Sequence, residues 1–393
     1  WSSDVCSSDL KDSEKLRTFQ NSIPSESENE LIPRLKVSDL SLHFEKISTK
    51  TTEIQGIPVF VNTEPTAGIL YVDVAFAADT LPPALYPHLP CLCECVSQVG
   101  WGGQNWAFVQ TEIQRVTGGF GAYTCTARVP DCVSEEVRQK NYVGRDWVIF
   151  HFKVLEEFSS RAFDLLSDCL NGTDFSDTAR LRDLLLGQYN AFQSYLVPYA
   201  SLFASSRASC KINKNRAVTE IWEGLSAYFT VQKNVSDSVE VVARRLKNIF
   251  ARLKKGGAVI HLTGTQNGIK NAKKLLPSFI KNVSLIPPQK AYGFSDVDFF
   301  ALTELPFEEK AEKSFQNENP FSPQEIIVIP GTVGFAAAAF PASPFDSREC
   351  IADGVFSHWL TTTELWQKIR MEGGAYGVSL SNNSDSNFMR FYS

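Results

Sequence analysis

Strand-forming and helical patterns follow one another in blocks along this chain, and their order constrains the fold more than any other feature. Segments rich in β-branched and aromatic residues, with period-two alternation, lie at 56–78, 119–129 and 146–156. From 157 to 234 the apolar residues recur at helical spacing instead. Strands followed by a run of helices predict an α+β domain.

A second block of the same kind follows the first. Residues 258–265 have strand character, 267–280 have helical character, 325–343 again contain strand-forming residues, and 346–360 form a helical pattern. Between them, residues 287–323 are poorly periodic and predict a long surface excursion. The repeated order hints at a duplicated α+β unit.

The expected division of the chain follows from its length. A chain of 393 residues is too long for one ordinary core, so we expect one domain at 46–250 and a second at 251–393. The polar residues 11–45 predict the end of a helical linker. Residues 1–10, WSSDVCSSDL, resemble translated sequencing adapter and are set aside together with Cys6. We expect the chain to be truncated at both ends, with the second domain incomplete.

Composition excludes several classes of function. The net charge is −6, so no strong field favours nucleic acid. No window approaches the run of about 18 apolar residues that a membrane span needs. Beyond Cys6, eight cysteines lie mostly in apolar patterns without the spacing of a disulfide framework, which favours reduced core cysteines. The compartment stays unknown, with cytoplasm or an organelle matrix favoured over secretion.

Three local patterns give further predictions. The Thr-Glu-Pro-Thr turn inside 56–78 predicts an antiparallel hairpin. A helix is expected at 105–116, ended by Gly118 and Gly119. The helix expected at 236–255 has an apolar side and a basic side. The basic side is either a polyanion-binding surface or an ordinary solvated face with cations near the helix C-terminus.

The most specific stretch is LWQKIRMEGGAYG, at 365–377. An amphipathic helix runs into Gly373 and Gly374, and we expect a strand that begins with Ala375 and Tyr376. Arg370 and Tyr376 then emerge at one junction, where two donors on rigid elements can hold a developing oxyanion. Alternatively, Arg370 is a helix C-terminal cation and Tyr376 an ordinary strand aromatic.

The helix before this junction is expected to be interrupted. Thr361 and Glu364 have the spacing of a capping box, in which a hydroxyl and a carboxylate cap the first amides of a new helix. We therefore expect one helix to end and another to begin near the three threonines 361–363.

A family resemblance rests on this stretch. LWQKIRMEGGAYGVSLSNNSD resembles the Arg-x-x-Gly-Gly-Ala-Tyr-Gly segment of the pitrilysin-type inverted zincins, in particular their presequence-protease and falcilysin branch. The segments LIPRLKVSDL, GIPVFVNTEPTAGILYVDVAF, LPPALYPHLPCLCECVSQVG, IQRVTGGFGAYT and EIWEGLSAYF resemble, in order, the C-terminal half of that branch. The likeness covers nearly all of the chain.

The resemblance implies two consecutive domains, each an antiparallel sheet with helices on one face. It implies a zinc metalloendopeptidase whose two halves enclose unfolded peptides, with this chain as part of the C-terminal half. Arg370 and Tyr376 are then catalytic donors toward the substrate carbonyl, and Gly373, Gly374 and Ala375 contact the substrate. The expected partners are unfolded peptide substrates and the missing N-terminal half, with neither nucleic acid nor membrane.

The chain departs from the family at the zinc site. The family's His-x-x-Glu-His pentapeptide is absent, so we expect no metal ligands here, zinc bound only in the full-length enzyme, and no activity of this chain alone. The segment HLPCLCEC offers His88 and three cysteines, but cysteines two apart point to different sides of a helix. The alternative is a non-catalytic peptide-binding or structural subunit of the same superfamily.

Overall fold

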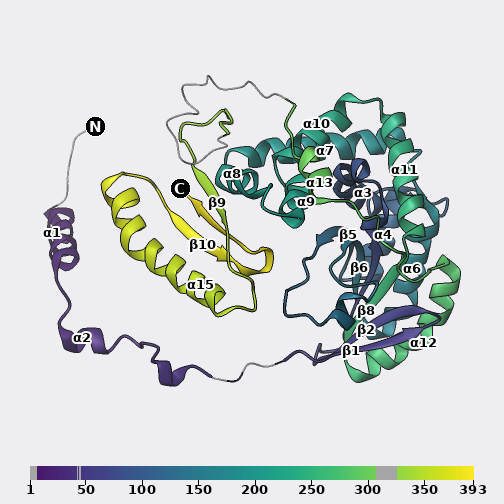
Figure 1. Cartoon of the computed structure of the whole chain (residues 1–393), viewed down its shortest axis with the longest axis horizontal. Coiled ribbons are helices and arrows are strands. Elements are labelled where there is room, and N and C mark those ends of the chain that lie inside the picture. The colour runs from purple at the N-terminus through teal and green to yellow at the C-terminus, as the bar shows by residue number, and fades with distance from the viewer. Residues whose placement is uncertain (1–6, 42, 44–45, 307–324) are drawn as a thin grey trace. The chain divides into compact units, whose positions relative to one another are not determined.

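The computed structural model describes residues 7–41, 43, 46–306 and 325–393 (Figure 1). Contacts divide the chain into two units, Trp1–Ile47 and Ser48–Ser393. The first unit contains helices α1 (Ser7–Asn21) and α2 (Glu26–Glu30). Ser25 and Glu28 form a capping box at the start of α2, which explains why so short a helix begins there.

A six-stranded sheet organises the second unit, in the order β1-β2-β8-β3-β6-β5. All neighbours are antiparallel except β2 and β8, which are parallel. The α+β class is confirmed. The strands are β1 (Thr49–Ile54), β2 (Ile57–Thr63), β3 (Ile69–Ala77), β5 (Gly119–Thr126), β6 (Asp146–Leu155) and β8 (Ala258–Gly264).

The predicted hairpin within 56–78 is wrong, because β8 lies between β2 and β3. Ile260 of β8 pairs with Val59 on one side and with Val74 on the other. The tight hairpin joins β1 to β2 instead, where Gln55 and Gly56 both have positive φ, at 52° and 81°. Two such residues suit the two-residue turns that match strand twist.

The position of β8 also differs from the expected boundary near residue 250. The strand expected to open the second domain completes the first sheet, so this sheet extends to residue 264. The alternation in a strand sequence predicts which face of the strand is buried. It does not predict the neighbouring strands, because strand pairing joins residues far apart in sequence.

Helices cover one face of the sheet (Figure 1). The main ones are α3 (Leu89–Val96), α6 (Ser159–Gly172), α11 (Val239–Lys255) and α12 (Gln266–Val283). Alternate strand residues such as Val72, Phe76, Phe150, Phe152 and Ile260 are buried beneath them. Residues 127–145 cover one end of the other face, where the rings of Phe60 and Tyr142 meet edge to face with centroids 5.0 Å apart.

A layer of helices adjoins the sheet and includes part of the predicted excursion. The layer comprises α7 (Thr178–Leu196), α8 (Ala200–Ser209), α9 (Lys214–Glu223), α10 (Leu225–Ser236) and α13 (Asp296–Leu302). Phe299 of α13 is 1% exposed and packs against Tyr86 with ring centroids 5.0 Å apart. The surface excursion expected at 287–323 is therefore wrong for α13, and residues 307–324 lie outside the described part.

The C-terminal part contains a separate sheet of order β10-β11-β9. Its elements are β9 (Ala337–Pro341), α15 (Arg348–Leu360), the π-helix η5 (Thr361–Glu372), β10 (Ser379–Asn383) and β11 (Phe388–Tyr392). Asn213 Nδ2 donates to the Ser386 carbonyl at 2.8 Å, and the Arg216 guanidinium lies 4.6 Å from the Phe388 ring centre. These contacts tie the small sheet to the helical layer.

The remaining elements are short. They are α5 (Glu135–Arg138), β4 (Gly100–Trp101), β7 (Thr173–Asp174) and several stretches of 3-10 helix, beside the longer helix α4 (Trp106–Val116). The helix expected at 105–116 is confirmed, with the Asn105 side chain accepting from the Phe108 amide at its start. No helix in the described ranges is long and apolar enough to cross a bilayer.

Candidate functional site

One continuous helix carries the candidate site toward its C-terminal end. α15 begins at the Ser347 cap and passes into η5 without interruption, since Thr361 keeps helical angles of φ −62° and ψ −48°. The helix changes type where a new helix was predicted, from α-helix through Leu360 to π-helix from Thr361, but the predicted capping box does not form. The Thr361 hydroxyl donates to the Leu380 carbonyl at 3.0 Å and accepts from the Leu380 amide at 2.8 Å. The side chain that could have capped a new helix is thereby bonded to β10.

The glycine junction ends this helix by internal hydrogen bonds. The amides of Gly373, Gly374 and Ala375 donate to carbonyls of the last turns, at 3.0, 3.1 and 3.1 Å. Gly374 has φ +74°, and a Cβ at Gly373 would lie 2.6 Å from the Ile369 carbonyl oxygen. Both positions therefore require glycine.

Arg370 and Tyr376 lie on either side of the junction. The Arg370 guanidinium stacks on the Trp366 ring, 4.1 Å from its centre. Tyr376 is 97% exposed and lies in the link before β10, which begins at Ser379 and not at Ala375. Among the described residues no hydrogen bond joins Arg370 to Tyr376. Trp366 was not singled out from the sequence, although its spacing of four residues from Arg370 on one helix is the signal for such a pair.

The charged side chains near Arg370 are solvent-exposed and have hydrogen-bond partners within η5. Lys368 Nζ lies 2.9 Å from Glu364 Oε2, and this hydrogen bond raises the pKa of Lys368. Gln367 Nε2 donates to Glu372 Oε1 at 3.1 Å. The carboxylates therefore have partners of their own, and Arg370 is left with the aromatic contact.

The HLPCLCEC segment is part of the core. Cys91, Cys93 and Cys95 are all buried in α3, and burial raises the pKa of Cys93. Burial also lowers the pKa of His88 to about 4, which keeps its imidazole neutral at pH 7. Across the described ranges, no group of three or more His, Cys, Asp or Glu side chains is placed to hold a metal ion.

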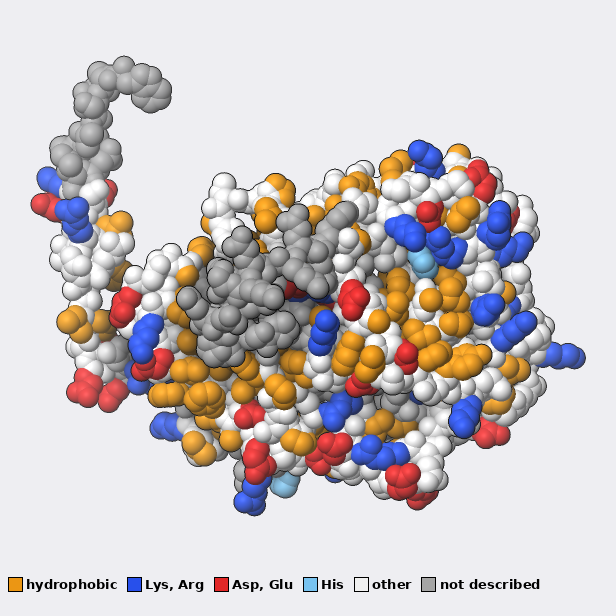
Figure 2. Space-filling view, turned by 45° about the horizontal axis from the view of Figure 1, so that its top comes forward, with side chains coloured by type: hydrophobic (Ala, Val, Ile, Leu, Met, Phe, Trp, Pro, Cys, Tyr) orange, Lys and Arg blue, Asp and Glu red, His pale blue; other side chains and the backbone are white. Residues whose placement is uncertain are grey.

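Two basic side chains of α11, Arg245 and Lys254, are hydrogen-bonded to other parts of the protein. Arg245 donates to Asn234 Oδ1 at 3.0 Å and to Asp237 Oδ2 at 2.8 Å, and Lys254 donates to the Leu170 carbonyl at 2.7 Å. On the face shown in Figure 2, Lys and Arg side chains are dispersed among acidic and apolar ones. These contacts favour the interpretation as an ordinary helix surface.

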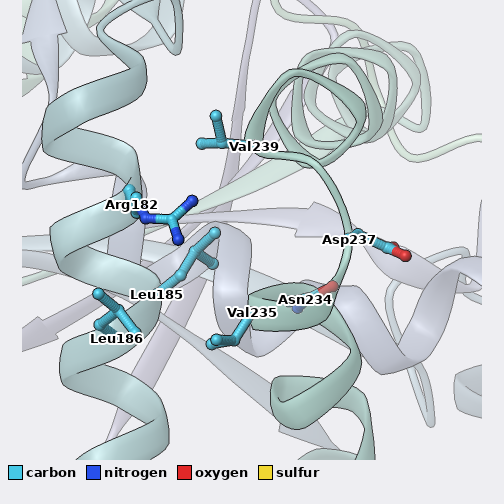
Figure 3. A pocket seen from close by; sticks show the side chains of 7 residues that line it. All are labelled: Arg182, Leu185, Leu186, Asn234, Val235, Asp237 and Val239. Atoms are coloured by element: carbon cyan, nitrogen blue, oxygen red, sulfur yellow. The ribbon is translucent and has the colours of Figure 1, made fainter.

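A hollow beside this helix has few polar groups. It lies where α7 meets the connection from α10 to α11 (Figure 3). The lining side chains are Arg182, Leu185, Leu186, Asn234, Val235, Asp237 and Val239. Asn234 is 1% exposed, and its Nδ2 has no partner among the described residues. The hollow is remote in sequence from the glycine junction and contains no catalytic combination of groups.

Comparison with known proteins identifies the family. The family model described as Peptidase M-16C associated matches residues 10–233, more than half of the chain. The chain belongs to this family. The predicted resemblance to the C-terminal part of pitrilysin-type peptidases, in the presequence-protease branch, is thereby confirmed.

Individual relatives agree with this assignment. The chain is 24% identical to presequence protease 1, chloroplastic/mitochondrial, of Arabidopsis thaliana, over 92% of this chain and 31% of that protein. It is 24% identical to the mitochondrial presequence protease of Yarrowia lipolytica, over 98% of this chain and 37% of that one. The chain thus spans about a third of the length of these relatives.

A solved structure supports the fold. A conserved protein of Enterococcus faecalis superposes with a TM-score of 0.57 at 11% identity, over 88% of this chain and 74% of that one. At this identity the likeness concerns the fold alone.

Proposed function

We propose that this chain is part of the C-terminal half of a zinc metalloendopeptidase that degrades short unfolded peptides. In this proposal the chain forms chamber wall, and Arg370 and Tyr376 donate hydrogen bonds to the substrate carbonyl and to the oxyanion that develops from it. Gly373, Gly374 and Ala375 contact the substrate backbone. The observation that carries the proposal is the glycine junction, which presents both donors at the end of one helix.

The geometry at Arg370 suits this role. Stacking on Trp366 occupies the flat face of the guanidinium, so the N–H donors at its edge stay available. Tyr376 has an exposed hydroxyl on a short link between Gly374 and β10. A stacked guanidinium and an exposed phenol can therefore approach one oxygen from two directions.

Zinc and the general base belong, in this proposal, to the N-terminal half of the polypeptide. The described residues do not fit a zinc site, so no step through the metal is assigned to this chain. Without its partner half, the chain is expected to be inactive. The compartment stays unknown, and the proposal favours cytoplasm or an organelle matrix over secretion.

The test uses the full-length protein and a fluorogenic unstructured peptide. Arg370→Ala is expected to lower kcat about 100-fold with little change in KM, because it removes a donor used in the transition state. Arg348→Ala is the matched control, since Arg348 is an exposed arginine at the start of α15. A metal chelator should abolish cleavage in both.

Two outcomes would contradict the proposal. Unchanged kcat in Arg370→Ala would remove the catalytic role of this residue. Absence of any chelator-sensitive cleavage by the full-length protein would favour the non-catalytic peptide-binding subunit.

A further inference from the structure

The open face of the six-stranded sheet carries three polar side chains next to one another, on β6, β3 and β8. Strand pairing aligns Gly121, His151, Asp73, His261 and Phe60 across β5, β6, β3, β8 and β2. Partners on adjacent strands project from the same face of a sheet, with Cβ atoms about 5 Å apart. One aspartate on the central strand β3 is therefore flanked by a histidine on each side.

One oxygen of Asp73 is held and the other is not. His261 Nδ1 lies 3.1 Å from Asp73 Oδ2, while His261 Nε2 lies 2.8 Å from Asn62 Oδ1. The Asn62 amide donates in turn to Thr49 Oγ1 at 3.0 Å. This chain of contacts fixes the orientation of the carboxylate. Asp73 Oδ1 has no hydrogen-bond partner among the described residues, and the side chain is 31% exposed.

Lys153, which strand pairing places on the same face as Asp73, is directed away from this carboxylate. Lys153 is on β6, one strand from Asp73, but its side-chain carbons lie over Gly118 and Gly119 at the β5 edge. A Cβ at Gly119 would lie 3.1 Å from Lys153 Cε. The two glycines thus leave room for the Lys153 side chain on the side of β6 away from Asp73. The lysine ammonium therefore forms no ion pair with Asp73 Oδ1.

Two exposed aromatic side chains lie on the same face of the sheet as Asp73. Tyr71 precedes Asp73 by two residues on the same strand and is 41% exposed, so both side chains project from one face. Tyr123 is 44% exposed, and its ring centre lies 5.4 Å from that of His151. Burial and the charge of Asp73 raise the pKa of Tyr123, so the field of this carboxylate extends to the second ring.

This part of the face differs from the part that the protein covers itself. Beneath residues 127–145, the face is apolar and buried, with Ala75, Ala77, Trp147 and Val259. The uncovered part is polar and carries a carboxylate at its centre. A surface prepared for another packed protein layer would be expected to continue the apolar pattern. The uncovered part instead suits a polar or charged ligand.

We propose that Asp73, with Tyr71 and Tyr123, forms a subsite for an arginine side chain of a bound extended peptide, a proposal that rests on the peptide-degrading function above. The carboxylate supplies the charge-assisted hydrogen bond through Oδ1, and the rings supply faces on which a guanidinium stacks. His261 is a positioning residue, because it holds the carboxylate through Oδ2.

The experiment compares two labelled peptides that differ in one side chain, which is arginine in one peptide and citrulline in the other. An unstructured peptide with a single arginine is titrated against this chain by fluorescence anisotropy, beside the same peptide with citrulline in place of arginine. Citrulline keeps the size and removes the charge. The arginine peptide is expected to bind about tenfold more tightly, as a charge-assisted hydrogen bond implies.

Variants locate the effect. Asp73→Asn should remove the preference for arginine and leave citrulline binding unchanged, whereas Asp183→Asn, at an exposed position of α7, should preserve the preference. Circular dichroism checks that both variants are folded. In the wild-type chain, imidazole NMR signals of His151 and His261 should shift with the arginine peptide, which tests the location without any variant.

The outcomes separate this subsite from the proposed function. Equal affinity of the two peptides for the wild-type chain refutes the subsite and leaves the peptidase proposal intact. A preference that survives in Asp73→Asn also refutes it. If neither peptide binds to the wild-type chain, both the subsite and the proposed contact between this chain and peptides are refuted.

Discussion

Phe299 is predicted to anchor α13, the short helix that follows α12, to the protein core. It is the only fully buried aromatic of the short helix α13. Its ring meets the ring of Tyr86 edge to face, and Lys214 Nζ lies over the ring, 5.0 Å from its centre. A helix of seven residues is not stable alone, so its position depends on this anchor. Phe299→Ala removes the ring and leaves a cavity, which costs about 3–5 kcal/mol of unfolding free energy.

The assay is urea unfolding followed by circular dichroism, with Val297→Ala as the matched control. Val297 lies in the same helix but is 70% exposed, so its truncation should change the unfolding free energy by less than about 0.5 kcal/mol. The urea midpoint of Phe299→Ala should fall with an unchanged slope. A loss below about 1 kcal/mol would refute the anchoring role and favour the surface excursion expected from the sequence.

Three further predictions concern the site and the core. Gly373→Ala should lower the free energy of unfolding by about 1–3 kcal/mol, because the new Cβ meets the Ile369 carbonyl. Gly377→Ala, with open space around the residue, should change it little, and thermal unfolding measures both variants. Trp366→Ala should lower kcat of the full-length enzyme about threefold by releasing Arg370, whereas Trp359→Ala should not, as steady-state kinetics can establish. Burial lowers the pKa of His88 to about 4, so between pH 6.5 and 4 the unfolded chain binds more protons than the folded chain. The free energy of unfolding should therefore fall as the pH decreases from 6.5 to 4. His88→Gln should flatten this dependence in urea titrations, and an unchanged pH dependence would contradict the prediction.

Local chemistry explains the features that sequence patterns predicted correctly. The helix at 106–116 begins at Asn105 because an asparagine there caps the first free amides. Period-two alternation identified β3 and β6, since alternate residues of each strand are buried under the helices. The glycines at 373 and 374 end η5 because a side chain does not fit the first and a positive φ is required at the second. Family-specific spacing in the same stretch singled out Arg370 and Tyr376.

Tertiary structure decided the features that depend on distant residues. The place of β8 between β2 and β3 follows from pairing with strands that lie far earlier in the sequence, as between Ile260 and Val59, and no local pattern encodes such a choice. Thr361 has the spacing of a cap, yet its hydroxyl bonds to β10, which only the folded chain brings near. The Asp73 and His261 pair depends on the same insertion of β8. Sequence patterns report which groups each element exposes or buries; packing alone decides which exposed groups meet.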